Sequence, residues 1–205
     1  MKKFELTNEF ITNMFGTKLF RIRALVEFGD VEAGELGGYV EKESNLGHDD
    51  NAWVYGDALV YGNALVSGDA QVSGDARVYD NAWVYGDAQV SGDALVYGNA
   101  RVYGNAWVYG NALVCGNAWV YGNARVSGDA RVYGDEDYAY AHGFGSVNRT
   151  TTFFRLKDGG VGVRCGCFYG TLAQFRDKIR ETHGETKKAQ EYLMLADLMK
   201  LRFEK

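Results

Sequence analysis

The stretch VYGNARVYGNAWVYGNALVCGNAWVYGNARV, residues 96–126, repeats one six-residue unit in which only a few positions change. Valine recurs every six residues from Val54 to Val132, fourteen times without a slip, and alanine recurs on the same period. Gly-Asp or Gly-Asn stands between them, except where Asp80 replaces the glycine. The unit is therefore V-[YSC]-G-[DN]-A-x, and such an unbroken internal period indicates a repeat architecture.

Each unit combines a short strand with a corner. In a triplet such as Trp53-Val54-Tyr55, strand geometry turns the valine to one side and both neighbours to the other. The Gly-Asp or Gly-Asn that follows is turn chemistry, and the alanine is small enough for a tight corner. Three units then close a triangle of 18 residues, and each strand pairs with the strand of the next coil, about 4.8 Å away. The period of six and the repeated glycine exclude a heptad coiled coil.

This pattern resembles the hexapeptide-repeat proteins. The expected fold has an all-β core, a left-handed parallel β-helix of triangular coils, and the handedness is what the resemblance implies. The interior would hold only Val and Ala, with no cavity for a substrate. Any function is therefore expected on the outer faces, between subunits or at the two ends.

Residues that lie 18 apart are expected to stack on one outer face. The first face carries Leu65, Trp83, Arg101 and Trp119; the second carries Leu59, Arg77, Leu95, Leu113 and Arg131; the third carries Trp53, Gln71, Gln89, Trp107 and Arg125. Stacked aromatic side chains stabilise neighbouring coils. Large apolar patches also mark interfaces. The resemblance to hexapeptide-repeat proteins implies a homo-oligomer, with a trimer as the preferred state.

Two further segments flank the coils. Residues 1–39, with the β-rich run LFRIRALVEF, are predicted to cap the first coil, since a bare coil end exposes unpaired strand edges. The β-helix is predicted over 40–137. At its start Val40 and Ser44 are expected to fill a Val slot and an Ala slot, and Leu46 the next Val slot. Two extra residues should bulge out within the following GHDDN.

Residues 138–205 are predicted to form a C-terminal α+β unit for capping or oligomerisation. RTTTFFRLKDGGVGVRCGCF predicts a β-hairpin. TLAQFRDKIRETHG predicts a helix with Thr171 as N-cap and Gly184 as its stop, and ETKKAQEYLMLADLMKLRF predicts a second, amphipathic helix. Cys165 and Cys167 should share one strand face. They lack two further ligands, so buried thiols are expected and no metal site.

The composition bears on partners and location. The formal net charge of −5 argues against general binding to nucleic acids or to anionic membranes, both of which favour basic surfaces. No apolar run has the length of a signal peptide or a transmembrane helix. Three cysteines without a leader fit a reducing compartment. We therefore expect a protein of the bacterial cytoplasm that does not bind membranes.

The two ends extend the resemblance over nearly the whole chain. RIRAL and AGELGGYVEKESNL near the start, the NAWVYG repeats, and NRTTTFF, CGCFYGTL and ETHG near the end are similar to a group of bacterial and phage hexapeptide-repeat proteins. Members of this group are often labelled acyltransferases on fold similarity or left without a function. Fold alone does not fix function.

Acyltransferase activity is one hypothesis. The resemblance implies a histidine general base beside a cofactor groove, with acyl-CoA as the donor, and a general base must titrate near neutrality. The candidates are His48 in the bulge and His142 just past the last clear coil, with His183 near a helix end. The repeats themselves contain no histidine and no inserted loop. The ordinary interpretation of each histidine is a solvated or capping residue.

The preferred hypothesis is a non-catalytic oligomer, without a cofactor, that sequesters a small anionic or nucleotide-like ligand. Arginine and aromatic side chains can hold a phosphate and stack on a base. Arg101 lies between Trp83 and Trp119, beside Tyr85 and Tyr103. The C-terminal unit offers a second basic and hydroxyl-rich set: Arg149, Thr150, Thr151, Thr152, Arg155 and Arg164.

The phage resemblance makes a host immune signal a candidate for this ligand. The basic set could instead be an ordinary solvated strand surface. A third hypothesis is a structural or protein-binding scaffold that presents its aromatic face to a partner.

Overall fold

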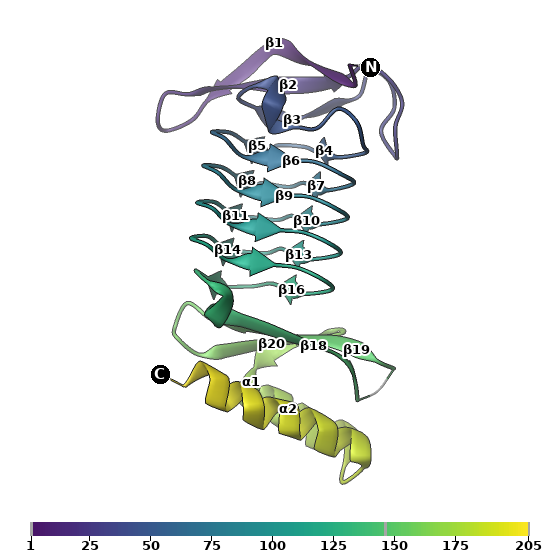
Figure 1. Cartoon of the computed structure of the whole chain (residues 1–205), viewed down its shortest axis with the longest axis vertical. Helices are drawn as coiled ribbons and strands as arrows, with labels where there is room; N and C mark the ends of the chain where they lie inside the picture. The colour runs from purple at the N-terminus through teal and green to yellow at the C-terminus, as the bar shows by residue number, and fades with distance from the viewer. Residues whose placement is uncertain (1, 146, 205) are drawn as a thin grey trace.

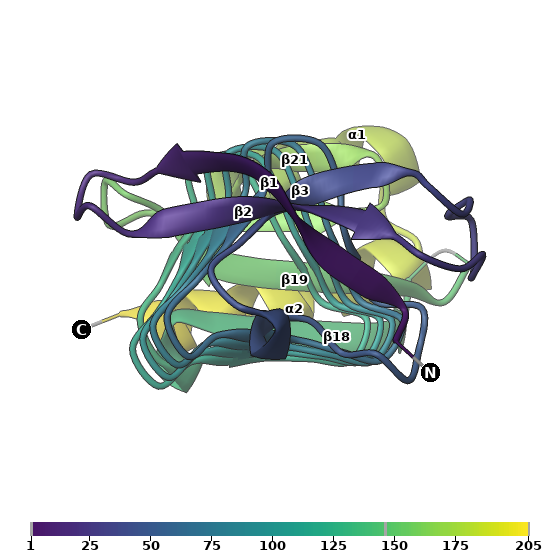
Figure 2. The ribbon, with the colours of Figure 1, turned by 90° about the horizontal axis from the view of Figure 1, so that it is seen from above.

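The computed structural model describes residues 2–145 and 147–204 and is an elongated column (Figure 1). The N-terminal strands lie at one end, the stacked coils form the middle, and a small sheet with two helices closes the other end. Seen along its axis, the middle is a triangular prism (Figure 2). The expected fold class, a parallel β-helix with caps at both ends, is confirmed.

Every coil strand is two residues long and consists of the valine and the residue before it. These strands are β4 (Trp53–Val54), β5 (Leu59–Val60), β6 (Leu65–Val66), β7 (Gln71–Val72), β8 (Arg77–Val78), β9 (Trp83–Val84), β10 (Gln89–Val90), β11 (Leu95–Val96), β12 (Arg101–Val102), β13 (Trp107–Val108), β14 (Leu113–Val114), β15 (Trp119–Val120), β16 (Arg125–Val126) and β17 (Arg131–Val132).

The strands assemble into three parallel sheets, one for each side of the prism. The coil strands run β5-β8-β11-β14-β17 in one sheet, β4-β7-β10-β13-β16 in the second and β6-β9-β12-β15 in the third. Each pairing joins residues 18 apart, as in Leu95 with Leu113. The three predicted outer faces are therefore the outer sides of these three sheets.

The core of the prism consists of the valine and alanine side chains of the repeat. The repeat valines from Val54 to Val132 are 0% exposed, and the repeat alanines are 0–1% exposed. Glycine at the corners is required because φ is positive there and because successive corners touch. A Cβ on Gly68, where φ is +68°, would lie 2.8 Å from the backbone nitrogen of Gly86.

The N-terminal cap is an antiparallel extension of one coil sheet. It comprises β1 (Phe4–Thr12), β2 (Lys18–Ala24) and β3 (Leu36–Val40), and β3 pairs in parallel with β5. Phe4 packs edge-on against the fully buried Trp53, with 6.2 Å between ring centroids. The cap thus covers the open end of the first coil with aromatic side chains.

One predicted slot near this cap is wrong. Ser44 is exposed, because the chain forms a 3-10 turn, η1 (Glu43–Asn45), in place of an ordinary corner. Asn45 turns inward instead, is 0% exposed, and donates from Nδ2 to the carbonyl oxygens of Ala64 at 2.8 Å and Gly62 at 3.2 Å. The neighbouring Leu46 does occupy a valine slot, opposite Val66.

The C-terminal unit is a four-stranded antiparallel meander with two helices. A 3-10 turn, η2 (Asp135–Asp137), leads into β18 (Tyr138–Phe144), β19 (Arg149–Arg155), β20 (Val161–Cys165), β21 (Phe168–Thr171), α1 (Leu172–His183) and α2 (Lys187–Phe203). The helices pack on the side of the sheet away from the coils (Figure 1).

The helix boundaries follow their capping residues. The Thr171 side chain accepts from the N–H of Gln174, and α1 ends at Gly184, where φ is +57°. Both predicted boundaries are confirmed. The expected strand face shared by Cys165 and Cys167 is wrong. Cys167 lies in the two-residue turn between β20 and β21, where Cys165 pairs with Phe168, so its thiol is exposed.

Candidate functional site

The C-terminal unit closes the last coil by satisfying its free backbone donors. Inside the prism, an N–H such as that of Leu95 donates to a carbonyl of the next coil, here Ala112, at 2.9 Å. The last coil has no such neighbour, and side chains replace it. Asp135 accepts from the N–H of Trp119 at 2.8 Å, and Thr152 accepts from the N–H of Arg125 at 2.9 Å. The end of the repeat is therefore a joint, by which we mean the contact in which side chains of the C-terminal unit pair with the backbone of the last coil.

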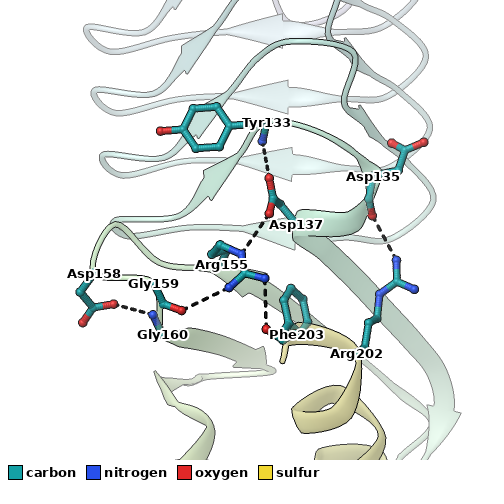
Figure 3. A network of polar contacts seen from close by, with 9 residues as sticks. All are labelled: Tyr133, Asp135, Asp137, Arg155, Asp158, Gly159, Gly160, Arg202 and Phe203. Atoms are coloured by element: carbon teal, nitrogen blue, oxygen red, sulfur yellow. Dashed lines mark hydrogen bonds and ion pairs between the residues drawn. The ribbon is translucent and has the colours of Figure 1, made fainter. Parts of the chain in front are cut away.

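An ion pair fixes the joint (Figure 3). Arg155 Nε lies 3.0 Å from Asp137 Oδ1, and the other carboxylate oxygen of Asp137 accepts from the N–H of Tyr133 at 3.0 Å. Arg155 also donates to the carbonyl oxygens of Gly159 at 3.3 Å and Phe203 at 3.2 Å. The Arg155 side chain is only 17% exposed, so it joins the sheet, the last coil and α2 rather than presenting a free cation.

Two of the predicted threonines are buried, Thr152 at the joint and Thr151 on the helix side of the sheet. Thr151 is 1% exposed and donates to Cys165 Sγ at 3.2 Å, and Thr152 is 0% exposed. Neither hydroxyl is available to a ligand at the surface. Arg164 also lies against the coils, with its guanidinium 5.7 Å from the Tyr109 ring centroid and its Nε buried. Of the three consecutive threonines, only Thr150 is not buried.

A hollow of about 580 Å³ opens where the third coil face meets the C-terminal sheet. Its lining residues come from the last coils, from β18 and β19, and from the turn before β21; they are Asn105, Trp107, Asn123, Arg125, His142, Arg149, Thr150 and Gly166. The structure therefore brings the predicted Arg149, Thr150 and His142 together.

Sequence reasoning placed Trp107 and Arg125 on this face but did not identify them as site residues. They lie 18 residues apart, and β16 is the last strand of its sheet, so the 18-residue spacing next to the end of the repeat was the available signal. The Arg125 guanidinium lies 4.8 Å from the Trp107 ring centroid. Cation and indole thus form one stacked surface in the hollow.

On the opposite wall, Arg149 of β19 lies against the turn between β20 and β21. Its guanidinium lies against Gly166, where an added Cβ would come within 2.0 Å of Arg149 Nη1. Gly166 has φ of +59°, a left-handed backbone conformation that glycine adopts without strain. His142 Nδ1 lies 2.9 Å from Thr150 Oγ1, across the β18–β19 pair.

The charges of the hollow are all of one sign. Among the described residues that line it, Arg125, Arg149 and His142 carry or can gain positive charge, and none is Asp or Glu. Arg125 and Arg149 also form no ion pair within residues 2–145 and 147–204. The hollow therefore offers two unneutralised guanidinium groups in a chain of net charge −5.

The predicted site around Arg101 lies on the first coil face, formed by β6, β9, β12 and β15, away from the hollow. The Arg101 guanidinium lies 5.1 Å from the Trp83 ring centroid and 5.0 Å from that of Trp119, as the sequence predicted. Tyr85 and Tyr103 stack beside it with 4.9 Å between centroids. Trp83 and Trp119 are 44% and 42% exposed, so this is a flat aromatic ladder without an enclosing wall.

The three histidines do not form one site. His48 stacks on Phe4 at 4.4 Å and accepts the Lys3 N–H at 3.2 Å, in the N-terminal cap. His142 lies on β18, and His183 stacks on Tyr192 at 5.9 Å at the end of α1. His48 is therefore at the opposite end of the column from the other two (Figure 1).

The bulge that carries His48 is closed by a buried lysine. Lys3 is 3% exposed, and its Nζ donates to the carbonyl oxygens of Asp50 at 2.7 Å and Ala52 at 2.8 Å. Burial lowers the pKa of Lys3 to about 8. These contacts tie the bulge to β1, so it acts as part of the cap.

Comparison with known families agrees with this architecture. The model of the YdcK β-solenoid repeat matches residues 52–68, 70–86, 88–104, 96–110, 106–122 and 124–135. This chain is a capped β-solenoid repeat protein. The matches end at the joint, so the repeat family describes the solenoid and not the C-terminal unit that completes the hollow.

A comparison with the curated proteins finds no match for the chain. Across residues 2–145 and 147–204, the solenoid protein has no group of three or more His, Cys, Asp and Glu side chains arranged for a metal ion. None of its described helices combines the length and the apolar character that a membrane crossing requires.

Proposed function

We propose that this solenoid protein is a non-catalytic, oligomeric binding protein that sequesters a small anionic, nucleotide-like ligand in the hollow at the joint. The observation that carries the proposal is the convergence of Arg125 and Arg149, from two different units, on one hollow whose described lining includes no carboxylate. The sequence holds 27 acidic residues against 22 Lys and Arg, so a lining with only basic chargeable groups favours anions against the overall charge.

The remaining lining groups favour a ligand with a flat ring. Trp107 is 39% exposed and already carries the Arg125 guanidinium on its face. A base or similar ring can stack on such a surface while guanidinium groups hold the phosphate. The side-chain amides of Asn105 and Asn123 supply donors and acceptors for the edge of the ring.

The resemblance to phage hexapeptide-repeat proteins supports a host immune signal as the ligand. Sequestration requires stoichiometric binding without turnover. Native mass spectrometry of freshly purified protein, followed by denaturation and analysis of released small molecules, should yield an intact nucleotide-sized anion. Recovery of a hydrolysed or acylated product would contradict sequestration.

The location of the site is tested with adenosine 5′-monophosphate and adenosine as paired probes in titration calorimetry. The nucleotide should bind and the nucleoside should bind at least about tenfold more weakly, because each charge-assisted hydrogen bond contributes about 1.5–3 kcal/mol. Arg125→Ala and Arg149→Ala should each remove most of this difference. Arg77→Ala, an exposed arginine on another sheet, is the matched control and should bind as wild type. Equal binding by all the variants would overturn the proposed site.

Arg101→Ala separates the two sites predicted from the sequence. If the nucleotide is held on the aromatic ladder, this variant loses binding and Arg125→Ala does not. We expect the reverse, because the ladder offers one guanidinium on a flat surface.

Gly166→Ala tests the positioning of Arg149. The added methyl group can be accommodated only if the guanidinium moves, so nucleotide affinity should fall by roughly the same factor as in Arg149→Ala. The strained φ should cost about 1–2 kcal/mol of stability. Retained affinity would show that Arg149 does not contact the ligand from its present position.

A second function, acyl transfer, is favoured by one contact. His142 lies at the hollow and is oriented by Thr150, which suits a general base. If the protein is an acyltransferase, acyl-CoA is the donor, and His142→Ala should abolish turnover while His48→Ala should not. We prefer sequestration to acyl transfer, because His142 at the hollow is also explained as a group that binds the anion.

We propose further that the protein is a homo-oligomer, with a trimer as the preferred state, held together through its aromatic faces. Trp83, Trp119 and Tyr121 each expose 40–44% of their surface on one sheet. Native mass spectrometry of wild type and of a Trp83→Ser, Trp119→Ser variant tests this. An unchanged oligomer would exclude this face. Capture of a partner protein that depends on it would favour the scaffold hypothesis instead.

A further inference from the structure

A second hollow, of about 240 Å³, lies on the other side of Arg149. Its walls are apolar and come from the β20–β21 turn and α1, with Phe168, Phe175 and Ile179 facing the space. Its basic lining residues are Arg149, Lys178 and His183. As in the first hollow, none of the described residues that line it is Asp or Glu.

The two hollows share a wall. Arg149 lines both, and the turn on which its guanidinium rests contributes Gly166 to the first and Cys167 to the second. An anion held by Arg149 therefore has a polar, aromatic compartment on one side and a small apolar compartment on the other. Neither compartment is formed by the repeat alone, since both depend on β19 and the β20–β21 turn.

We propose that the second hollow receives an apolar substituent of the same anionic ligand, so that the ligand class is a phosphate diester, with the ring-bearing group in the first hollow and a short aliphatic or single-ring group in the second. This inference rests on the proposed function. The hollow has about eight times the ~30 Å³ that one water occupies in the liquid, which is enough for roughly six to eight non-hydrogen atoms. Lys178 and His183 at its edge would hold a second polar group of the ligand near the surface.

Titration calorimetry with inorganic phosphate, ethyl phosphate and hexyl phosphate tests this compartment. Each buried methylene contributes about 0.8 kcal/mol, or about fourfold in affinity, before the cost of ordering the chain. Hexyl phosphate should therefore bind at least about tenfold more tightly than ethyl phosphate, by the same relation. All three should depend on Arg149.

Two variants test whether the tighter binding of hexyl phosphate arises in the second hollow. Thr182 is an exposed residue of α1 that lines the second hollow. The tryptophan side chain in Thr182→Trp should fill this hollow, so the affinity for hexyl phosphate should fall to that for ethyl phosphate. Ala173→Trp adds the same side chain at an exposed position of α1 that does not line this hollow, and should bind as wild type. Equal effects of the two substitutions would overturn the proposal.

Cys167 provides a readout that does not depend on affinity. Its thiol is exposed, whereas Cys165 is half-buried and Cys115 is buried, so Cys167 should react first with a thiol reagent. Saturating hexyl phosphate should slow this reaction severalfold, and saturating inorganic phosphate should not. Cys167→Ser identifies the reacting thiol.

The outcomes separate the two proposals. Binding of all phosphates with equal affinity, dependent on Arg125 and Arg149 and without protection of Cys167, would sink the second compartment and leave the proposed anion site standing. No binding of any phosphate probe would overturn both. Tighter hexyl phosphate binding that Arg149→Ala abolishes and Thr182→Trp reduces would support both.

Discussion

The coils and the C-terminal unit solve the same problem in opposite ways. In the coils, the strand donors, such as the N–H of Leu95, meet carbonyls one coil away, and valine and alanine with 0–1% exposure fill the interior. In the C-terminal unit, the donors of the last coil meet side chains instead, such as Asp135 and Thr152. Regularity makes the coil interior a packed core, and the irregular end creates both hollows.

This difference explains where chemistry can be located in such a chain. A repeat that stacks on itself must present the same inner surface in every coil, which leaves only outward positions free to vary. At the joint, residues from the last coils and from the meander have no partner of their own kind. Arg125 and Arg149 face one space there because two architectures meet.

The sharpest test of the comparison places one charge on either side of a single coil strand. Val90 is 0% exposed, and Val90→Asp should cost more than about 4 kcal/mol or prevent folding, because a buried carboxylate has no partner there. Gln89→Asp, on the outward side of the same strand, should cost less than about 0.5 kcal/mol. Urea unfolding followed by circular dichroism measures both. Similar losses would mean that the interior is not sealed.

Substitution at the joint should unfold the protein more locally than substitution in the coil interior. Asp137→Ala removes the partner of Arg155, whose side chain is 17% exposed, and should cost roughly 3 kcal/mol. Hydrogen exchange should rise first in β19 and α2 and remain slow in the central coils. Asp177→Ala breaks an exposed pair with Arg180 and should cost less than about 1 kcal/mol. Uniform exchange over the whole chain would contradict a separate joint.

Alkaline pH should act on the coils through their tyrosine ladder. Burial raises the pKa of Tyr79 to about 12, and a hydrogen bond with the Cys115 thiol together with burial raises that of Tyr97 to about 12. The folded state then holds these protons more tightly than the unfolded state, so this contribution is complete below pH 10 and is lost between pH 10 and 12. The Tm should fall over this range.

The double variant Tyr79→Phe, Tyr97→Phe should show a smaller fall in Tm, since it keeps the stacked rings without the hydroxyl groups.

Lys3 in the cap contributes to the pH dependence of stability with the opposite sign. Its lowered pKa means that stability should rise between pH 8 and 10.5, and Lys3→Met should remove this rise. Identical profiles for all three proteins would exclude these groups as the cause.

The smallest expected effect is a gain in stability at the end of the hairpin beside the hollow. Val147 has φ of +53°, which a β-branched residue adopts only with strain, and its side chain is 75% exposed. Val147→Gly should stabilise the protein by about 1 kcal/mol in urea unfolding, and Val147→Ala by less. Because Val147 does not line the hollow, nucleotide binding should stay unchanged. A loss of stability in Val147→Gly would mean that the valine side chain has a packing role.

Several predictions followed from local rules and are confirmed. The fixed six-residue period determines the coil and its three faces, because parallel stacking allows only residues 18 apart to pair. Thr171 and Gly184 bound the first helix, because capping depends on the residue and its immediate neighbours. The predictions for Ser44 and for Cys167 failed where one residue of shift, set by a tight turn, changes the direction of a side chain.

The candidate site divides along the same line. The sequence by itself named Arg149, Thr150 and His142 as candidates, and its repeated Val and Ala predicted the packed coil interior that the structure shows. It did not determine that Thr151, Thr152 and Arg155 would be occupied by contacts within the protein. Only the tertiary structure decided that, because the helices cover the side of β19 that carries Thr151, while Thr152, on the side that meets the last coil, binds the backbone of Arg125 and leaves Thr150 at the hollow.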